Sequence, residues 1–496
     1  MKRLLTQLAA GAALLCPCLP AQAVSHVFLV QNSGWMEPFY ADPASQFKPL
    51  VTELAAAVTQ PGDRMVLAAF NQSLPGAPSP KALMSARVAE GAVRAQVRDA
   101  LAGLQPARKP GSSALADTDL GEAVQAAIGT ALGGKPGLVW LVTNNRNSPH
   151  NDQATARRNR EFYQLIHQGG GIAAALAYPL KMPVEGTHFR ADGLMLYVFA
   201  VGEQGARELD ALLAAGRIAH VITEPPARLK PLDRATVRLV PRKVENAPGV
   251  SFSMAPDGML RADVAPDANA PAAKIGWNLE NTMYPYTIAS ATLAARSVLG
   301  FDTRDIRLDD ASIRNLAPGH SEPLASVMQL PVAQLPGKWS LDAIRSAGSA
   351  FVLPGRIELQ LSGQRLELSQ TFRRRMEALF PGDPLPDIFV PPADIRGSRA
   401  VLPIEVRVHY GMAPLAALMG GALALTAALG AAAYAYARPR KAYLTVDGEP
   451  RTMMARAGTT QPVYDKAGAQ LAQLKTTIFG HQLTGLREGA QVRLGR

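Results

Sequence analysis

The sequence has very little cysteine. Its only two, Cys16 and Cys18, lie in an apolar N-terminal segment that begins after two basic residues. The small residues of Ala21-Gln22-Ala23 follow, so residues 1–23 are expected to be a signal peptide that is cleaved after Ala23. An uncleaved anchor is the alternative, but the apolar run is short for a membrane span. The mature chain would then have no thiol for a disulfide, a nucleophile or a metal.

Familiar catalytic motifs are also missing. The sequence contains no GxSxG elbow, no Walker A loop and no HExxH motif. No two of its eight histidines have the i, i+4 spacing of a metal-binding pair on a helix. A Ser/His/Asp group would have to assemble across the fold, where sequence spacing does not reveal it. We therefore expect no catalytic residues and no enzymatic activity, with an envelope hydrolase as the least favoured alternative.

Charge is absent from one long stretch, Met412 to Ala437. This apolar run exceeds the roughly 20 residues that cross a bilayer, so 412–437 is expected to be a transmembrane helix. Tyr434 and Tyr436 lie at its end and Arg438 follows at once, which is typical of a cytoplasmic interface. The sequence thus predicts a single-pass membrane protein with a periplasmic ectodomain and a cytoplasmic tail, residues 438–496.

The positive charge has an uneven distribution. The formal net charge is +11, and the tail from Arg438 onward contributes +6 of it, from ten basic and four acidic residues. With Lys2 and Arg3 also removed, only +3 remains on the large middle part. Nucleic-acid binding would require basic residues clustered on a folded face, so no nucleic-acid partner is expected. The tail charge either marks topology or favours anionic lipid headgroups.

Residues 24–226 alternate short apolar runs with segments of helical periodicity. Val27–Val30, Met65–Phe70 and Leu138–Val142 are typical of buried strands. Apolar strands that alternate with amphipathic helices predict a mostly parallel sheet covered on both faces, a doubly wound α/β fold. Ligands of such sheets bind beyond the carboxyl ends of the strands, which makes the following loops the expected functional positions.

Three short sequences in this region carry a family resemblance. Val27–Met36 resembles the first strand and loop of von Willebrand factor A-type domains, and Thr118–Val124 is similar to the family's second loop and helix. Leu141–Asn145 stands where the family has Thr-Asp-Gly after the central strand. The resemblance implies a vWA-like fold for residues 24–226 and an adhesion site in these loops, where the family binds a divalent cation.

The cation site itself departs from the family's pattern. The first loop of the family reads Asp-x-Ser-x-Ser, whereas here Gln31, Ser33 and Trp35 take those positions. Asn144 replaces the carboxylate of the third loop, and Thr118 keeps the family's residue. A hard cation favours carboxylate oxygens, and both carboxylates have become neutral amides. We therefore expect a degenerate adhesion site with no tightly bound metal and no other cofactor.

Two alternatives remain open at this site. Asp117 or Asp119 could complete a weak divalent-cation site. Trp35 could anchor a protein or peptide partner, or it could fold back and fill a site that has lost its cation. The expected binding rim consists of Gln31, Asn32, Ser33, Trp35, Thr118 and Asn144.

The remaining segments are rich in strand patterns. Residues 227–410 contain alternating apolar and polar runs between turn residues, which predicts one or two β-sandwich modules. Gln370–Leu379 is expected to be a helical insertion in this region. The tail is predicted to be a small β-leaning domain, with a hairpin turn at Asp447-Gly448 and further strands at Val463-Tyr464 and Gln491–Leu494.

The expected function follows from the missing catalytic motifs, the degenerate adhesion site and the predicted transmembrane helix. The chain is expected to be a membrane-anchored, non-enzymatic protein-binding or scaffold protein of the cell envelope. Its partner is expected to be another envelope or membrane protein, with the oligomeric state left open. The alternative is a transmembrane signalling or assembly subunit that couples binding at the ectodomain to the tail.

Overall fold

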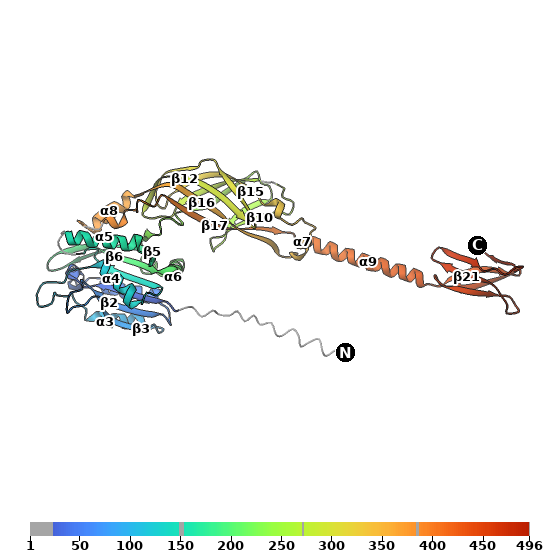
Figure 1. Ribbon diagram of the computed structural model, residues 1–496, viewed down its shortest axis with the longest axis horizontal. Coiled ribbons are helices and arrows are strands. Elements are labelled where there is room, and N and C mark those ends of the chain that lie inside the picture. The colour runs from blue at the N-terminus through green and yellow to red at the C-terminus, as the bar shows by residue number, and fades with distance from the viewer. Residues whose placement is uncertain (1–22, 148–152, 270–271, 383–385, 496) are drawn as a thin grey trace. The chain divides into compact units, whose positions relative to one another are not determined.

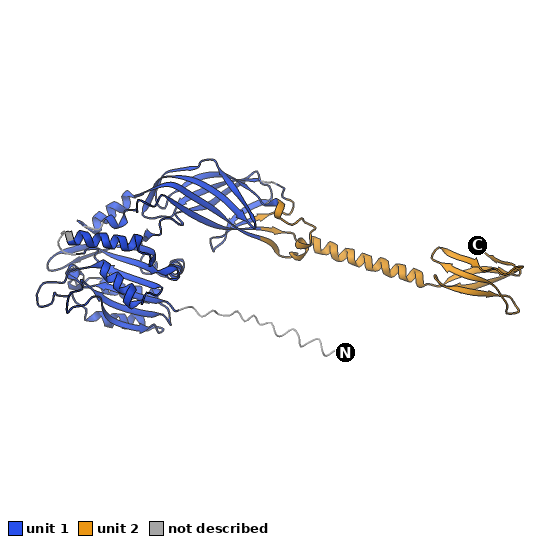
Figure 2. Cartoon of the chain, in the orientation of Figure 1, with its two compact units in different colours: residues 1–262, 268–332, 353–406 blue, residues 263–267, 333–352, 407–496 orange. Residues whose placement is uncertain are grey.

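The structure is a computed structural model that describes residues 23–147, 153–269, 272–382 and 386–495. The expected signal peptide and both cysteines therefore lie outside the described residues, except for Ala23. The chain divides into two compact units, drawn in separate colours in Figure 2. The first comprises residues 1–262, 268–332 and 353–406, and the second comprises residues 263–267, 333–352 and 407–496.

The first unit contains a seven-stranded sheet in the order β3-β2-β1-β4-β6-β5-β7. Its strands are β1 (Ser25–Gln31), β2 (Arg64–Phe70), β3 (Lys81–Arg87), β4 (Gly137–Thr143), β5 (Ile172–Glu185), β6 (Arg190–Val201) and β7 (Ala227–Lys230). The strand β7 begins at residue 227, so this sheet extends beyond the domain boundary predicted at residue 226. The central strand β1 pairs in parallel with both β2 and β4.

The expectation of a mostly parallel sheet is wrong. The pairings β2–β3, β4–β6, β5–β6 and β5–β7 are all antiparallel, so parallel pairing is confined to the two neighbours of β1. The physical reason is connection length. Only residues 186–189 join β5 to β6, whereas a parallel crossover needs a dozen or more residues.

Helices cover both faces of this sheet, so the predicted mixed α/β class is confirmed. Phe28 and Val30 of β1 pack with α2 (Phe47–Val58), α3 (Val93–Ala102) and α6 (Gly202–Ala214). Alternate residues of the same strand, Val27 and Leu29, lie in a second core with three other helices. These are α4 (Leu120–Ala126), α5 (Gln153–Gln168) and α8 (Gln370–Leu379) (Figure 1).

The second region is β-rich, as the sequence predicted, but its hydrogen bonding differs from the expected sandwich. Its strands join one ten-stranded sheet in the order β8-β11-β15-β13-β12-β16-β17-β10-β9, with β14 paired to β12. The strands are β8 (Val237–Glu245), β9 (Val250–Met254), β10 (Leu260–Val264), β11 (Ala272–Asn281), β12 (Tyr286–Leu299), β13 (Asp302–Leu308), β14 (Ser312–Leu316), β15 (Ser321–Gln329), β16 (Ala350–Leu368) and β17 (Gly397–His409). Long strands with β-bulges, such as β12 and β16, run through the region. They join segments that the sequence pattern predicts as separate short strands.

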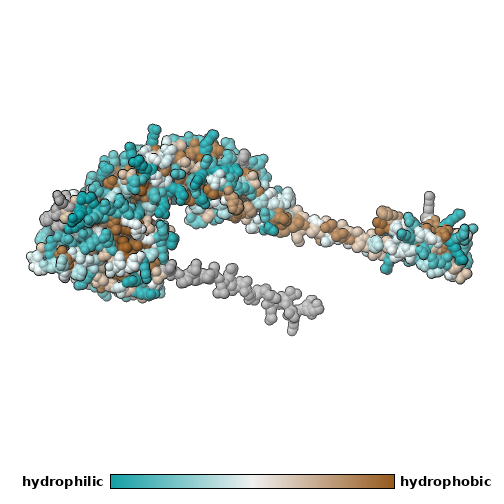
Figure 3. All heavy atoms as spheres, in the orientation of Figure 1, coloured by the Kyte–Doolittle hydropathy of each residue, from teal (hydrophilic) through white to brown (hydrophobic). Residues whose placement is uncertain are grey.

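The second unit contains an apolar helix followed by a small β domain. Helix α9 (Ala413–Ala437) is long and apolar enough to cross a membrane, and no part of its most apolar window is buried. Figure 3 shows its surface in brown and pale tones. The β domain has two three-stranded sheets, β19-β18-β23 and β20-β21-β22, around a shared apolar core. These strands are β18 (Arg440–Val446), β19 (Glu449–Ala455), β20 (Thr460–Tyr464), β21 (Gln470–Thr477), β22 (Gly480–Thr484) and β23 (Val492–Leu494).

The predicted hairpin in this domain is confirmed. Strands β18 and β19 are antiparallel, and only Asp447 and Gly448 separate them. Both residues have positive φ angles, 52° and 82°, as the two-residue turn of a twisted hairpin requires. Asp and Gly tolerate this conformation, and the turn is therefore readable from the sequence.

Candidate functional site

The candidate site lies at the carboxyl ends of the parallel strands β1 and β4. Gln31 is the last residue of β1, and Ser33 follows it in the loop. Thr143 is the last residue of β4, and Thr118 precedes the first turn of α4. These four polar side chains have no measurable solvent exposure. Because parallel strands end at the same edge, residues distant in sequence meet there.

The amide of Gln31 holds this group together. Its Oε1 accepts hydrogen bonds from the Thr143 hydroxyl at 2.5 Å and from the backbone N–H of Asn144 at 3.0 Å. Because a backbone N–H can only donate, this contact fixes which end of the amide is the oxygen. The Nε2 end then donates to Ser33 Oγ at 2.6 Å and to Thr118 Oγ1 at 3.0 Å. Thr118 Oγ1 also donates to Ser33 Oγ at 2.6 Å.

This arrangement does not fit a divalent cation. Ser33 and Thr118 supply the two hydroxyl oxygens that the resemblance assigns to a metal, and both accept hydrogen bonds from the Gln31 amide instead. A cation in contact with both oxygens would have to displace that NH₂ group, and Gln31 offers no negative charge in return. Among the residues that the structure describes, no group of three or more His, Cys, Asp or Glu side chains is placed to hold a metal ion.

The two carboxylates that could have completed a weak site have other partners. Asp117 forms an ion pair with Lys109 at 2.7 Å. Asp119 caps the N-terminus of α4 by accepting the backbone N–H of Glu122, and Arg158 lies 3.5 Å from its other oxygen. Both carboxylates thus contribute to local structure.

Asn32 lies beside the hydrogen-bonded core rather than within it. Its side chain donates to the Gln105 carbonyl at 3.4 Å and accepts from the Asn71 amide at 3.1 Å. It also lines a cavity of about 840 Å³ between the loop after β2 and residues 104–116. Asn32 was expected on the rim of the site, whereas no sequence pattern indicates this cavity.

Trp35 lies on the outer side of the same edge, half-buried. The Arg146 guanidinium lies 4.8 Å from the centre of its ring, and the Phe189 ring packs against it edge-on at 5.0 Å. The Asn144 side chain donates to the Trp35 carbonyl at 2.9 Å. Trp35 Nε1 is buried, and the described part of the chain offers it no acceptor. We call Trp35, Arg146 and Phe189 the Trp35 surface.

Two members of the Trp35 surface, Arg146 and Phe189, were not among the residues expected at the site. Arg146 comes two residues after Asn144 in the loop that follows β4. Its position near the site could therefore have been predicted from the strand pattern. Phe189 lies in the connection between β5 and β6, and no local pattern links it to Trp35. Of the expected rim residues, Gln31, Ser33 and Thr118 meet in the buried core, while Asn144 bridges that core to Trp35.

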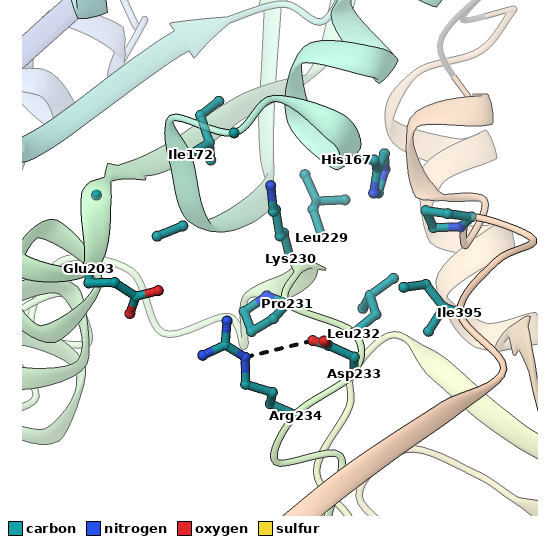
Figure 4. Close-up of a pocket in the computed structure, with 14 residues that line it drawn as sticks. His167, Ile172, Glu203, Leu229, Lys230, Pro231, Leu232, Asp233, Arg234 and Ile395 are labelled. Atoms are coloured by element: carbon teal, nitrogen blue, oxygen red, sulfur yellow. Dashed lines mark ion pairs between the residues drawn. The ribbon is translucent and has the colours of Figure 1, made fainter. Parts of the chain in front are cut away.

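A second cavity, of about 420 Å³, lies near the start of β5 and the end of β7 (Figure 4). Lys230 Nζ donates to the Gly169 carbonyl at 3.0 Å, and a ring nitrogen of His167 contacts the Ile388 carbonyl at 2.9 Å. Burial lowers the pKa of both His167 and Lys230. The described residues that line this cavity include no Ser, Thr, Tyr or Cys, so they contain no hydroxyl or thiol nucleophile for His167 to activate.

Comparison with known proteins does not extend these observations. No protein-family model matches this chain, and no curated protein matches it.

Proposed function

We propose that this chain is a membrane-anchored, non-enzymatic protein-binding or scaffold protein of the cell envelope, and that it binds its partner without a cation. The observation that carries this proposal is the position of the Gln31 amide. It hydrogen bonds to both hydroxyls, Ser33 and Thr118, through which a cation-dependent site would act. These contacts support a cation-free site, and we place it in a vWA-like domain whose adhesion site has become part of the core.

The Trp35 surface is the proposed contact for the partner. Tryptophan and arginine are enriched among the residues that dominate binding energy at protein interfaces. Trp35 packs against both Arg146 and Phe189, so little side-chain entropy of Trp35 would be lost on binding.

Anchoring through α9 is the second part of the proposal, with residues before it outside the cytoplasm and residues after it inside. The helix is uncharged, its most apolar window is not buried, and Arg438, Arg440 and Lys441 follow it. Its N-terminal end has an interfacial aromatic as well. Helix α7 (Leu341–Arg345) contacts α9, and Trp339 just before it is 65% exposed. Exposed tryptophan beside a span is typical of the membrane interface.

Affinity capture from solubilised membranes tests the binding proposal. The full chain carrying Trp35→Ala should recover its partner about tenfold less well than the unsubstituted chain, because the central contact is lost. Phe301→Ala is the matched control, since Phe301 is a fully exposed aromatic residue in the turn between β12 and β13. Chelation of divalent cations should leave recovery unchanged. Retention of every partner by Trp35→Ala, or loss of partners on chelation, would contradict the proposal.

A transmembrane signalling or assembly subunit is the second candidate. The observation that favours it is the tail, whose two sheets surround a core of their own. Deletion of residues 442–496 distinguishes the two functions. If the partner is still captured and the phenotype of the full chain is unchanged, the tail does not transmit a signal. If capture persists and the phenotype is lost, the signalling function is supported.

A further inference from the structure

The end of the tail domain that adjoins α9 consists of three segments. Strand pairing places Arg440 opposite Ala455, and the backbone of Thr476 bonds to Gly458 and Thr459. Residues 438–441, 453–459 and 474–482 therefore lie together, and we call them the helix-proximal end. The helix leads directly into it, because Arg440 is the third residue after Ala437, the last residue of α9.

Two large apolar side chains are exposed at the helix-proximal end. Phe479 is 94% exposed and Ile478 is 53% exposed, both in the turn between β21 and β22. Arg440 Nη1 donates to the Ile478 carbonyl at 2.9 Å, which ties this turn to the residues that follow the helix. Gly458 also lies close to the helix. A Cβ at this glycine would clash with the hydroxyl of Tyr436 in the last turn of α9.

Charge within the tail domain is strongly polarised. Every charged residue of the helix-proximal end is basic, namely Arg438, Arg440, Lys441, Arg456 and Lys475. None of the five forms an ion pair with a carboxylate among the residues described.

All four acidic residues of the tail lie at the opposite end. Asp447 and Glu449 flank the β18–β19 turn, Asp465 follows β20, and Glu488 lies between β22 and β23. Basic residues are present there too, but Lys466 pairs with Glu449. The net positive charge of the tail is therefore concentrated beside α9 rather than spread over the domain.

We propose that the helix-proximal end docks on an anionic lipid surface, with Ile478 and Phe479 inserted at the boundary of the acyl chains and the five basic side chains on the headgroups. This inference rests on the proposed anchoring by α9. Exposed aromatic and aliphatic residues surrounded by Lys and Arg bind membrane interfaces through apolar burial and attraction to anionic lipid. Continuity with the helix favours lipid over a protein partner, because a spanning α9 would hold this end at the bilayer permanently.

Depth-dependent quenching tests the docking directly. The full chain carrying Phe479→Trp is reconstituted into vesicles of phosphatidylcholine and phosphatidylglycerol with brominated acyl chains. Tyr464→Trp is the matched control, because Tyr464 is a 46% exposed aromatic residue near the acidic end of the same domain. Fluorescence is expressed relative to the unsubstituted chain, which has four tryptophans of its own. The tryptophan at 479 should be quenched at least about twofold more than the one at 464.

The charge contribution is tested in the same vesicles. Arg456→Glu combined with Lys475→Glu, added to Phe479→Trp, should reduce the quenching, because the acidic side chains repel anionic headgroups. Vesicles of phosphatidylcholine alone should show the same reduction without these substitutions. Equal quenching in both lipid compositions would overturn the electrostatic part of the proposal.

Flotation of the same samples separates this inference from the proposed anchoring. If the chain floats with the vesicles after alkaline washing but the tryptophan at 479 is not quenched, the anchoring stands and the docking is overturned. Protection of position 479 by a protein, such as a second copy of the chain, would give this result. If the chain does not float, both the anchoring and the docking fail.

Discussion

At the scale of single residues, Gln31 defines the character of the candidate site. Glutamine presents an acceptor and a donor on one planar group, and here each end meets the complementary kind of partner. The buried polar groups are thereby satisfied without a charge or an ion, which avoids the cost of burying a carboxylate. The candidate site is therefore a neutral core whose polar groups are bonded to one another.

Gln31→Glu should destabilise the first sheet at neutral pH. The second carboxylate oxygen would face Ser33 Oγ and Thr118 Oγ1, the two donated hydrogen bonds would be lost, and a charge would be buried. We expect a loss of about 3 kcal/mol in the free energy of unfolding. Thermal unfolding followed by tryptophan fluorescence measures it, since Trp35 and Trp140 belong to this part of the chain.

A divalent cation should partly restore the stability of Gln31→Glu, because the new carboxylate and the two hydroxyls form an oxygen-rich group. Gln164→Glu on the exposed face of α5 is the control and should change little with or without Mn²⁺. A Gln31→Glu chain as stable as the unsubstituted one would show that the amide is not required for the core.

At the scale of elements, α8 shows how the two sheets of the first unit are connected. Ser369 caps the helix by accepting the backbone N–H of Phe372 at 3.3 Å, so its start is set locally. The predicted helix at 370–379 is confirmed, yet its packing partner is the sheet of residues 25–230 rather than the β-rich region that surrounds it in sequence. Phe372 is 1% exposed and lies against Phe389 and Tyr284.

Phe372→Ala should release α8 from the first sheet. Truncation of a fully buried phenylalanine costs about 3–5 kcal/mol. We expect faster amide hydrogen exchange across residues 370–379, measured by mass spectrometry on the full chain. Arg374→Ala, on the exposed side of the same helix, should leave this exchange unchanged. Equal exchange in the two variants would mean that Phe372 does not hold the helix.

At the scale of the whole molecule, the proposed orientation in the membrane depends on the charge distribution and on α9. The uncharged helix separates a large N-terminal part from a small basic tail, and the tail residues next to the helix include no carboxylate. Basic residues near the end of a span are retained on the cytoplasmic side. The proposed orientation places the basic tail in the cytoplasm.

Cysteine labelling tests this orientation, because the native cysteines lie only at positions 16 and 18. In right-side-out membrane vesicles, an impermeant maleimide should label Ser113→Cys, an exposed position of the first unit. Lys466→Cys in the tail should react only after the membrane is permeabilised. Labelling of both positions in sealed vesicles would argue against a membrane between them, and the reverse pattern would argue for the opposite orientation.

The sequence by itself determined the features that depend on neighbouring residues. The uncharged run of α9, the Asp447-Gly448 turn and the helix after Ser369 each reflect local backbone geometry, side-chain polarity or a cap. It also indicated which loops follow the strands of the first sheet. Such features can be read without a fold, because the interacting groups are close together in the chain.

Only the tertiary structure decided which distant groups meet. Gln31 and Thr118 are 87 positions apart, and Trp35 meets Arg146 and Phe189 from separate loops. The direction of β6, the packing of α8 and the gathering of five basic residues beside Phe479 likewise depend on contacts across the fold. Strand pairing and side-chain packing set these contacts, and local periodicity does not encode them.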